Sequence, residues 1–271
     1  MPTKIACIGC SWTEGIAVDG QLMDHQDTYP YLLSKYLREN AKNNVMYNAG
    51  RSAAGTEYYH LVTDYLIKKF NPDIFVIQFT THDRGILPLD PIDENEKRLN
   101  FGYDTIDNTY CKIWDNNKSI MHLSPGMGAS ASKHSSETQW DGLIDKIYNE
   151  RIKGKMAPEV ELDTLKKYIA LWWEQSKNSD IQKYFYYSHM YSLLDYLEEL
   201  GKQVIPFHWM RYKPEFRTKL FELRPYPSIE GFLGNKRFKD LTHDNGFHFG
   251  VEGHTTIVQE LLGPAIQEII Q

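Results

Sequence analysis

The run Gly9-Cys10-Ser11-Trp12-Thr13-Glu14-Gly15 holds a serine between two glycines, directly after a short apolar stretch. A serine on a tight turn after a β-strand exposes its hydroxyl, which can attack a carbonyl carbon. Its own backbone N–H then points into the same space, where it would stabilise the oxyanion that the attack forms. A serine that only caps the following helix would fit the same letters. Ser11 is therefore a candidate nucleophile whose assignment depends on the other motifs.

A candidate general base lies near the other end of the chain, in the run from His243 to His254. A loop histidine with an acidic residue three or four positions earlier can serve as an oriented base. Three positions before His248 is Asn245, and four positions before it is Asp244. Asparagine can orient an imidazole but stabilises imidazolium poorly. We therefore assign the acid to Asp244 and keep Asn245 as the alternative.

Two further loops carry small or polar residues. Residues 48–56 read Asn-Ala-Gly-Arg-Ser-Ala-Ala-Gly-Thr, and small residues let the backbone approach a ligand closely. Residues 80–84 read Thr-Thr-His-Asp-Arg and follow a strongly apolar stretch. Each loop alone fits an ordinary connection between a strand and a helix. A functional role for either loop therefore depends on where the fold places it.

The elements that must position these motifs alternate along the first eighty residues. Apolar runs predict four strands, at 4–8, 45–47, 74–79 and 203–209. An early proline after Asp27-Thr28 marks the start of one helix, and further helices are predicted at 56–70, 159–175, 180–200 and 253–270. This β-α-β-α-β order predicts a parallel sheet with right-handed crossovers. The predicted fold class is α/β, a three-layer α/β/α sandwich with a central parallel sheet that is flavodoxin-like in strand order.

A stretch of about residues 88–158 interrupts this order. It is polar and aromatic, and we interpret it as an insertion over the sheet edge of a single domain, with short elements of its own. Its aromatic residues could stack on a sugar, but a small core of the insertion is the preferred interpretation for Tyr103, Tyr110, Trp114 and Trp140. Residues 212–242 are expected to be irregular. Arg211, after the fourth strand, could meet an anionic group of a substrate.

The four motifs should converge on one edge of the sheet. In an open parallel sheet, ligands bind at the carboxyl ends of the strands. The motif around Ser11 and the two small or polar loops each follow a predicted strand, and His248 precedes the last helix.

This order of motifs resembles the SGNH, or GDSL-type, hydrolases. Their first block reads G-D-S-x-T-x-G and matches residues 9–15 except at Cys10. Their second block resembles residues 48–56, and their third block, G-x-N-D, falls on residues 80–83. Their last block, D-x-x-H followed by G-H, fits His248 with Gly253-His254. The resemblance covers most of the chain outside the insertion.

The resemblance implies a serine ester hydrolase. Ser11 would attack an ester carbonyl and His248 would take its proton, so that an acyl-enzyme forms and water releases it. The implied substrate is a carboxylic ester on a small molecule or a glycan, such as an O-acetyl group, and no cofactor is required. An acyltransferase or a non-catalytic ligand-binding protein on the same fold is the alternative.

Two positions of the implied oxyanion hole depart from the family pattern, beside the backbone N–H of Ser11. The second-block glycine corresponds to Ala53 or, with a small shift, to Gly55, and we assign Gly55. The third-block asparagine is His82 in this chain. A neutral imidazole can donate one hydrogen bond, so His82 is assigned the role, and Gln78 and Arg84 are the alternatives.

Two other chemistries fit parts of the sequence less well. Cys7-x-x-Cys10 has the spacing of a thioredoxin-type redox pair, but Cys7 falls inside the first predicted strand, where a core position is favoured. A metal site is the second alternative, built from His243, Asp244, His248 and His254. Their spacing matches no i, i+4 ligand pair on a helix, so we predict no metal and expect His254 to pack locally at the last helix.

Bulk properties narrow the class of protein. The chain has 271 residues and a formal net charge of −6, which argues against a nucleic-acid partner. No apolar run approaches the ~18 residues that span a bilayer, and the start of the sequence lacks a signal-peptide pattern. The cysteines are few and their number, three, is odd, which does not suggest a disulfide framework. A reducing compartment is therefore expected. We therefore expect a cytoplasmic enzyme with no membrane partner.

Overall fold

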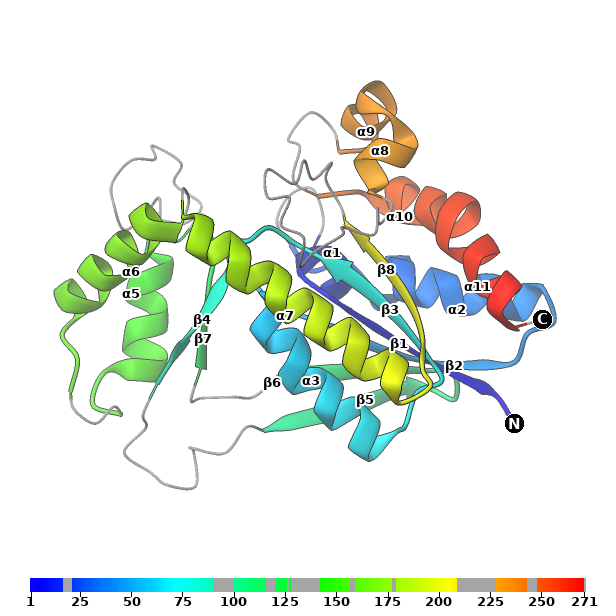
Figure 1. Ribbon diagram of the computed structural model, residues 1–271, viewed down its shortest axis with the longest axis horizontal. Helices are drawn as coiled ribbons and strands as arrows, with labels where there is room; N and C mark the ends of the chain where they lie inside the picture. Colours follow the sequence, from blue (N-terminus) through cyan, green and yellow to red (C-terminus); the bar gives the residue numbers. More distant parts are fainter. Residues whose placement is uncertain are drawn as a thin grey trace.

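A six-stranded sheet forms the centre of the computed structural model (Figure 1), which describes residues 1–16, 21–89, 100–115, 120–125, 127, 142–155, 159–176, 179–208, 228–242 and 248–270. The strand order is β5-β6-β2-β1-β3-β8. The strands are β1 (Thr3–Gly9), β2 (Asn44–Gly50), β3 (Ile74–Phe79), β5 (Phe101–Asp107), β6 (Tyr110–Asp115) and β8 (Gln203–His208). Neighbouring strands are parallel except β5 and β6, which are antiparallel. The predicted parallel sheet is confirmed, with one antiparallel strand added at its edge.

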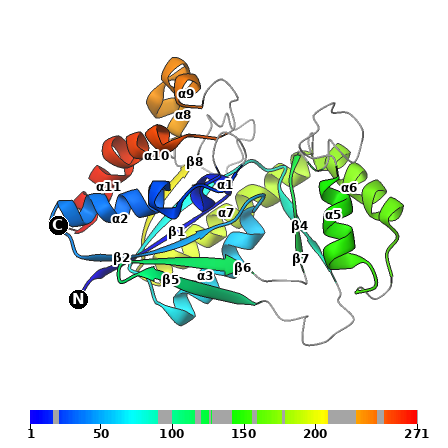
Figure 2. The ribbon, with the colours of Figure 1, turned by 180° about the vertical axis from the view of Figure 1, so that it is seen from behind.

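Helices cover both faces of the sheet (Figures 1 and 2). Because side chains alternate along a strand, Ile5 and Cys7 of β1 face one core and Ala6 and Ile8 face the other. The first core packs against α2 (Tyr29–Glu39), α10 (Val251–Ile257) and α11 (Gly263–Ile270). The second packs against α3 (Thr56–Lys69) and α7 (Asp180–Glu199). The predicted three-layer α/β/α sandwich is therefore confirmed.

The last helical region extends the predicted one by two residues at its start. It runs from α10 through a turn of π-helix at Val258–Leu262 into α11. None of the described helices combines the length and the apolar character needed to cross a bilayer.

The region expected to be an insertion divides between two places. Its strands β5 and β6 extend the main sheet beyond β2, whereas β7 (Ile120–Leu123) pairs antiparallel with β4 (Gly85–Pro88). Figure 1 shows β4 and β7 beside α5 (Leu143–Ile147) and α6 (Leu162–Ser176). Met121, Ile144 and Ile169 belong to a third, smaller core there.

Three of the four aromatic residues expected to build that small core, Tyr103, Tyr110 and Trp114, do not do so. Tyr110 is fully buried in the main core beside α2, because β6 joins the main sheet. Tyr103 and Trp114 are 41% and 38% exposed. Trp140 lies outside the described residues.

The expectation of an irregular segment before the last helix was wrong for residues 228–242. Two short helices lie there, α8 (Ile229–Leu233) and α9 (Asn235–Leu241). Ser228 caps α8, since its Oγ accepts a hydrogen bond from the Gly231 N–H at 3.0 Å. Phe238 and Leu241 of α9 are buried in the main core. The apolar pattern was too short to stand out in the sequence, and the packing of these residues stabilises the helices.

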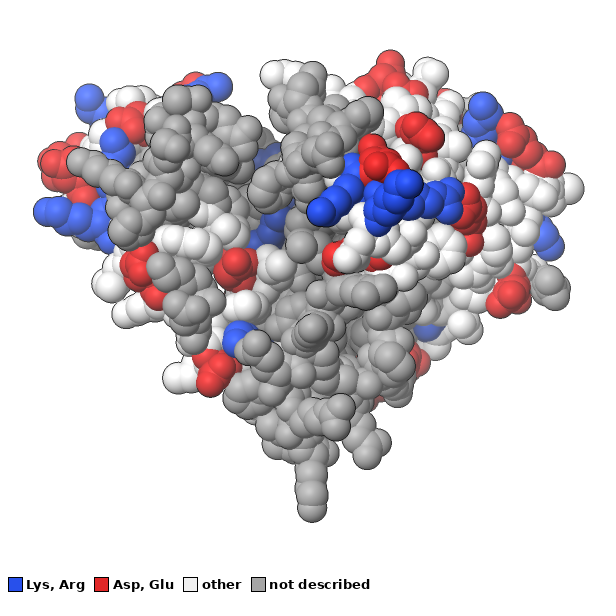
Figure 3. Space-filling view, turned by 90° about the horizontal axis from the view of Figure 1, so that it is seen from above, with Lys and Arg blue, Asp and Glu red and all other residues white. Residues whose placement is uncertain are grey.

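The upper face of the molecule carries charged side chains of both signs (Figure 3). One pair on this side of the sheet is Arg237 of α9 with Glu260, whose Nη2 and Oε1 atoms lie 2.5 Å apart. The two groups are each about half exposed, so the pair contributes little to stability.

Candidate active site

Ser11 begins α1 (Ser11–Glu14), directly after β1 ends at Gly9. Cys10 is the N-cap residue of this short helix and its side chain makes no capping hydrogen bond. The first N–H groups of a helix have no partner within the helix, so the Ser11 N–H is available at this edge of the sheet. The Ser11 residue is 8% exposed.

The hydroxyl of Ser11 contacts the imidazole of His248. The Ser11 Oγ and His248 Nε2 atoms lie 2.9 Å apart, although 237 residues separate them in the sequence. This is the distance at which a base can take the proton of a serine nucleophile. When the imidazole is neutral with its proton on Nδ1, Nε2 accepts the hydrogen bond that Ser11 donates.

His248 lies in an environment that favours the neutral imidazole. Burial is the larger cause and the positive charge of Arg84 the smaller one, and together they lower the pKa of His248 from its ordinary value of 6.5 to about 4. At neutral pH the ring is therefore unprotonated and can act as a base. Asp244 and Asn245, the two candidates for the acid that orients it, lie outside the described residues.

An aromatic cluster holds the His248 segment against α1. The rings of Trp12 and Phe249 lie 4.2 Å apart between centroids, and Phe238 of α9 packs against Phe249 at 5.5 Å. Trp12 and Phe249 each follow one of the two site residues directly in sequence, so their contact brings Ser11 and His248 together. Sequence reasoning missed this cluster, although both motifs carry an aromatic residue beside the functional one.

A chain of buried hydrogen bonds fixes the orientation of α1. Thr13 donates from Oγ1 to Gln78 Oε1 at 2.7 Å and accepts from the Tyr29 hydroxyl at 3.0 Å. The Tyr29 N–H donates to His254 Nδ1 at 2.9 Å. This chain links α1 to β3, α2 and α10, because its members come from all four elements. The carbonyl end of Gln78 is thereby used in positioning the Ser11 turn.

His254 is a fully buried residue of α10, as expected for a histidine that packs locally. Burial, with a smaller effect of His248, lowers the pKa of His254 to about 4. Because Nδ1 accepts from Tyr29, the proton of the neutral ring lies on Nε2. Within the described part of the chain, no group of three His, Cys, Asp or Glu side chains could hold a metal ion. His243 and Asp244 lie outside it.

The second loop lies against α1. A Cβ atom added to Gly50 would be 2.1 Å from the Glu14 nitrogen, so only glycine lets β2 end this close to α1. Glu14 then accepts hydrogen bonds from the Ser52 N–H at 2.6 Å and from the Ser52 hydroxyl at 2.5 Å. Arg51 lies 3.8 Å from the same carboxylate. Glu14, which sequence reasoning did not single out, therefore fixes this loop beside the candidate nucleophile.

Gly55 lies where the second loop meets the third. It is the N-cap residue of α3, and a Cβ atom there would be 3.1 Å from the Arg84 carbonyl oxygen. The alternative Ala53 has a left-handed backbone with φ of 62°, and the N–H of the next residue, Ala54, donates to the Arg51 carbonyl at 3.0 Å. Gly55 therefore lies directly beside the Arg84 backbone at the edge of the sheet.

The third loop follows β3 at the same edge. His82 is partly buried, with both ring nitrogens enclosed. Asp83 accepts a hydrogen bond from the Thr81 hydroxyl, which indicates a local structural role for Asp83. Arg84 is partly buried, and its Nε atom is enclosed.

The cysteines do not form a redox pair. Cys7 and Cys10 are free and buried, with Cys7 Sγ 3.4 Å from Met46 Sδ and Cys10 Sγ 3.8 Å from Gln78 Oε1. Burial raises the pKa of Cys7, which disfavours the reactive thiolate. Arg211, the other residue that the sequence placed near the edge, lies outside the described part.

Comparisons with known proteins add three distant likenesses. No protein-family model matches the chain, and no curated protein matches it in sequence. A carbohydrate acetylesterase family member from Sinorhizobium meliloti aligns over 99% of both chains, at 11% identity and a TM-score of 0.37. A protein designated an arylesterase from Agrobacterium tumefaciens aligns over 98% of this chain and 99% of its own, at 10% identity and a TM-score of 0.38.

A lipolytic protein of the G-D-S-L family from Desulfitobacterium hafniense aligns over 98% of this chain and 99% of its own, at 12% identity and a TM-score of 0.29. At these identities and TM-scores the function proposed below rests on the contacts of this chain. The contact that matters most joins Ser11 and His248 at the carboxyl ends of β1, β2 and β3.

Proposed function

We propose that this protein is a serine ester hydrolase of the SGNH type. The single observation that carries the proposal is the 2.9 Å contact between Ser11 Oγ and His248 Nε2 at the carboxyl edge of a parallel sheet. A neutral imidazole at hydrogen-bond distance from a serine hydroxyl is the arrangement that activates a serine nucleophile. The order of the four sequence blocks supports the same assignment.

In the proposed reaction, Ser11 Oγ bonds to the carbonyl carbon of an ester while its proton passes to His248 Nε2. The carbonyl oxygen becomes an oxyanion, for which the Ser11 N–H, the Gly55 N–H and the His82 side chain are the proposed donors. His248 then gives the proton to the departing alkoxide, which leaves an acyl group on Ser11. Water, activated by the same histidine, attacks this acyl-enzyme and releases the acid.

The imidazolium formed in each step needs a carboxylate partner. Burial and the nearby Arg84 both disfavour a positive charge on His248. Asp244 is the proposed partner at Nδ1, since its carboxylate can offset that charge. The substrate class is a carboxylic ester on a small molecule or a glycan, such as an O-acetyl group, and the proposed reaction needs water but no cofactor.

The proposal is tested with 4-nitrophenyl acetate and a fluorophosphonate probe. Wild-type protein should hydrolyse the ester and be labelled at Ser11, and Ser11→Ala should lose both properties while its far-UV circular dichroism stays unchanged. Ser192→Ala, a change on the exposed side of α7, is the matched control and should retain both. Turnover retained by Ser11→Ala would refute the mechanism. Labelling of wild-type protein without hydrolysis would replace it with acyl transfer.

A further inference from the structure

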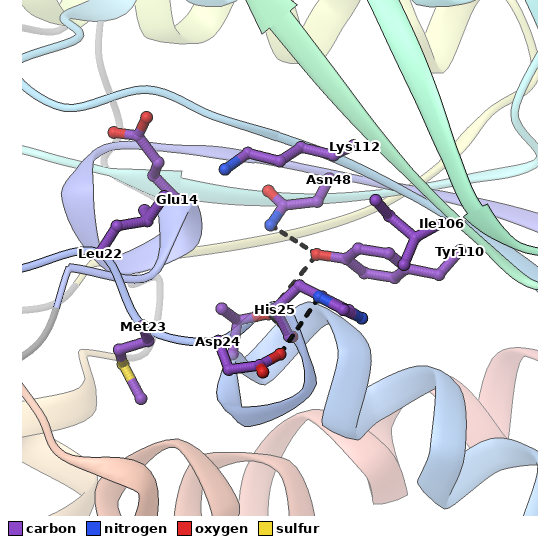
Figure 4. Close-up of a pocket in the computed structure, with 10 residues that line it drawn as sticks. Glu14, Leu22, Met23, Asp24, His25, Asn48, Ile106, Tyr110 and Lys112 are labelled. Carbon is purple, nitrogen blue, oxygen red and sulfur yellow. Dashed lines mark hydrogen bonds and ion pairs between the residues drawn. The ribbon is translucent and has the colours of Figure 1, made fainter.

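A cavity of about 280 Å³ lies beside α1, on the face of the sheet that α2 covers. Its walls come from β2, β5 and β6, from α1 and from the segment 22–28 that leads into α2. Figure 4 shows Lys112, Asn48 and Tyr110 reaching toward the same space, with Leu22 and Met23 on its opposite side. The volume is close to the lower end, about 300 Å³, of small-molecule sites.

Lys112 brings a positive charge into this cavity. It is partly buried on β6, and its ammonium forms no ion pair or hydrogen bond with any of the described residues. Asp104 lies directly opposite on β5, but the two side chains do not approach to ion-pair distance. An ammonium in a cavity is stabilised by an anion that can accept its N–H groups.

Two neutral groups beside Lys112 also have donor capacity to spare. Asn48 accepts from the Gly50 N–H at 2.9 Å and donates one amide hydrogen to the Tyr110 hydroxyl at 2.8 Å, which leaves its second amide hydrogen. Among the described residues, the acceptor that the Tyr110 hydroxyl proton can reach is Thr28 Oγ1, at a long 3.5 Å. Burial raises the pKa of Tyr110 to about 12, so the hydroxyl remains a donor at neutral pH.

Two carboxylates in the walls already hold neighbouring groups of this chain. Glu14 accepts from the Ser52 N–H and hydroxyl. Asp24 accepts from the Gln26 N–H at 3.0 Å and lies 3.1 Å from His25 Nδ1. The donors that reach toward the same space are those of Lys112, Asn48 and Tyr110, and together they suit an acceptor-rich ligand.

We propose that this cavity binds the carboxylate of a small hydroxylated molecule of about monosaccharide size, with Lys112 as its ion-pair partner and Asn48 and Tyr110 as hydrogen-bond donors. Apolar walls from Leu22, Met23 and Ile106 would cover the carbon skeleton.

The same residues connect the cavity to the candidate active site. Glu14 lines the cavity and holds Ser52, and Asn48 lines it and holds the Gly50 N–H. Both contacts fix the loop that leads to Gly55. If the proposed esterase activity holds, the bound carboxylate belongs either to the ester substrate itself or to a separate acid that binds beside it.

Direct binding measurements test the cavity without any reference to catalysis. In isothermal titration calorimetry, Ser11→Ala protein should bind glucuronate and bind neutral glucose at least ten-fold more weakly. Adding Lys112→Met should weaken glucuronate binding at least ten-fold, whereas adding Lys236→Met, at an exposed position of α9, should leave it unchanged. Adding Asp104→Asn should tighten it, because a nearby negative charge is removed. Equal binding of glucose and glucuronate, no glucuronate binding, or equal losses from both lysine variants would overturn the proposal.

Kinetics then distinguish the two sources of the carboxylate. These measurements use Lys112→Met in otherwise wild-type protein. If the carboxylate is part of the substrate, the variant should raise the KM for an O-acetylated methyl glucuronoside, and this increase should be at least ten-fold larger than the increase in the KM for 4-nitrophenyl acetate. Equal changes for the two esters, with glucuronate binding lost, would assign the cavity to a separate acid. Because binding is measured in the Ser11→Ala background, failure of the esterase proposal would leave the binding result interpretable.

Discussion

Two effects oppose the protonation of His248. Burial removes water from the ring, and Arg84 adds a positive charge nearby, so the pKa of the imidazole falls to about 4. These conditions keep the base free to accept a proton, but they also destabilise the imidazolium that the proposed reaction must form. A carboxylate at Nδ1 therefore has more to contribute here than in a site without Arg84.

The identity of that carboxylate is tested by two single changes. Asp244→Asn should lower kcat for 4-nitrophenyl acetate by about 10²- to 10⁴-fold, because a neutral amide does not offset the charge of imidazolium. Asn245→Ala should change kcat by less than about ten-fold. The opposite ranking of the two variants would move the acid register to residue 245.

Arg84 should contribute to the position of the acidic limb of the pH profile. With His248 protonated only near pH 4, kcat/KM of the wild-type enzyme should change little between pH 7 and pH 5. Arg84→Met removes the smaller of the two causes and leaves burial in place, so the pKa of His248 rises part of the way toward 6.5 and activity falls at a higher pH than in the wild type. The measurement is kcat/KM for 4-nitrophenyl acetate from pH 4 to pH 8. Arg237→Met, at a half-exposed arginine that pairs with Glu260, should leave the limb in place. A limb that moves to lower pH in Arg84→Met would contradict this account.

At the scale of elements, two contacts keep the candidate site together. The Trp12 and Phe249 rings join α1 to the segment before α10, and the Glu14 carboxylate joins α1 to the loop after β2. The short helix α1 is therefore held from both sides, which places Ser11 between the second loop and His248. A helix of four residues has little stability of its own, so its position depends on these contacts.

Removing one ring of this cluster should affect both stability and turnover. Phe249→Ala deletes a fully buried aromatic side chain and should lower the free energy of unfolding by about 3–5 kcal/mol. Urea unfolding measures the loss, and kcat should fall because His248 is no longer held beside Ser11. Phe232→Ala on α8, where the ring is 45% exposed, should cost about 1 kcal/mol or less. Equal losses from the two variants would show that the cluster has no special role.

Some elements could be predicted from sequence because their signal is local. The apolar run at Ile74–Phe79 predicts a buried parallel strand, and the early Pro30 predicts the start of α2. Other features depend on partners far away in the chain. The place of β6 beside β2 decides that Tyr110 is buried, and no local pattern at Tyr110 shows this.

The candidate site likewise contains residues that the sequence can predict and contacts that it cannot. Ser11 and His248 could be proposed from sequence because both lie in motifs with a fixed order of residues. The Thr13–Gln78 and Tyr29–His254 hydrogen bonds could not, because each joins residues that only the folded sheet and helices bring together. Gln78 and Arg84 are the alternatives to His82 in the oxyanion hole, and their roles also depend on contacts between residues far apart in the sequence.

At the scale of the whole molecule, burial of neutral histidines links folding to pH. His208 at the end of β8, His248 and His254 each have a pKa lowered to about 4, in every case mainly by burial. In the unfolded chain the same rings have a pKa near 6.5. Between these values the unfolded state binds more protons than the folded state, so the free energy of unfolding falls as pH falls from 6.5 toward 4.

His254 provides the clearest test, because it is fully buried and lies outside the proposed chemistry. Wild-type protein should lose several kcal/mol in the free energy of unfolding between pH 7.5 and pH 5, to which His254 contributes up to about 2 kcal/mol. His254→Asn should be less stable at pH 7.5, since the acceptor for the Tyr29 N–H is altered, but its stability should depend less on pH over the same range. Gln259→Asn, a change between uncharged side chains at an exposed position of the same helical region, should keep the wild-type dependence. Urea unfolding at both pH values measures each difference, and a wild-type stability that rises on acidification would be incompatible with neutral buried histidines.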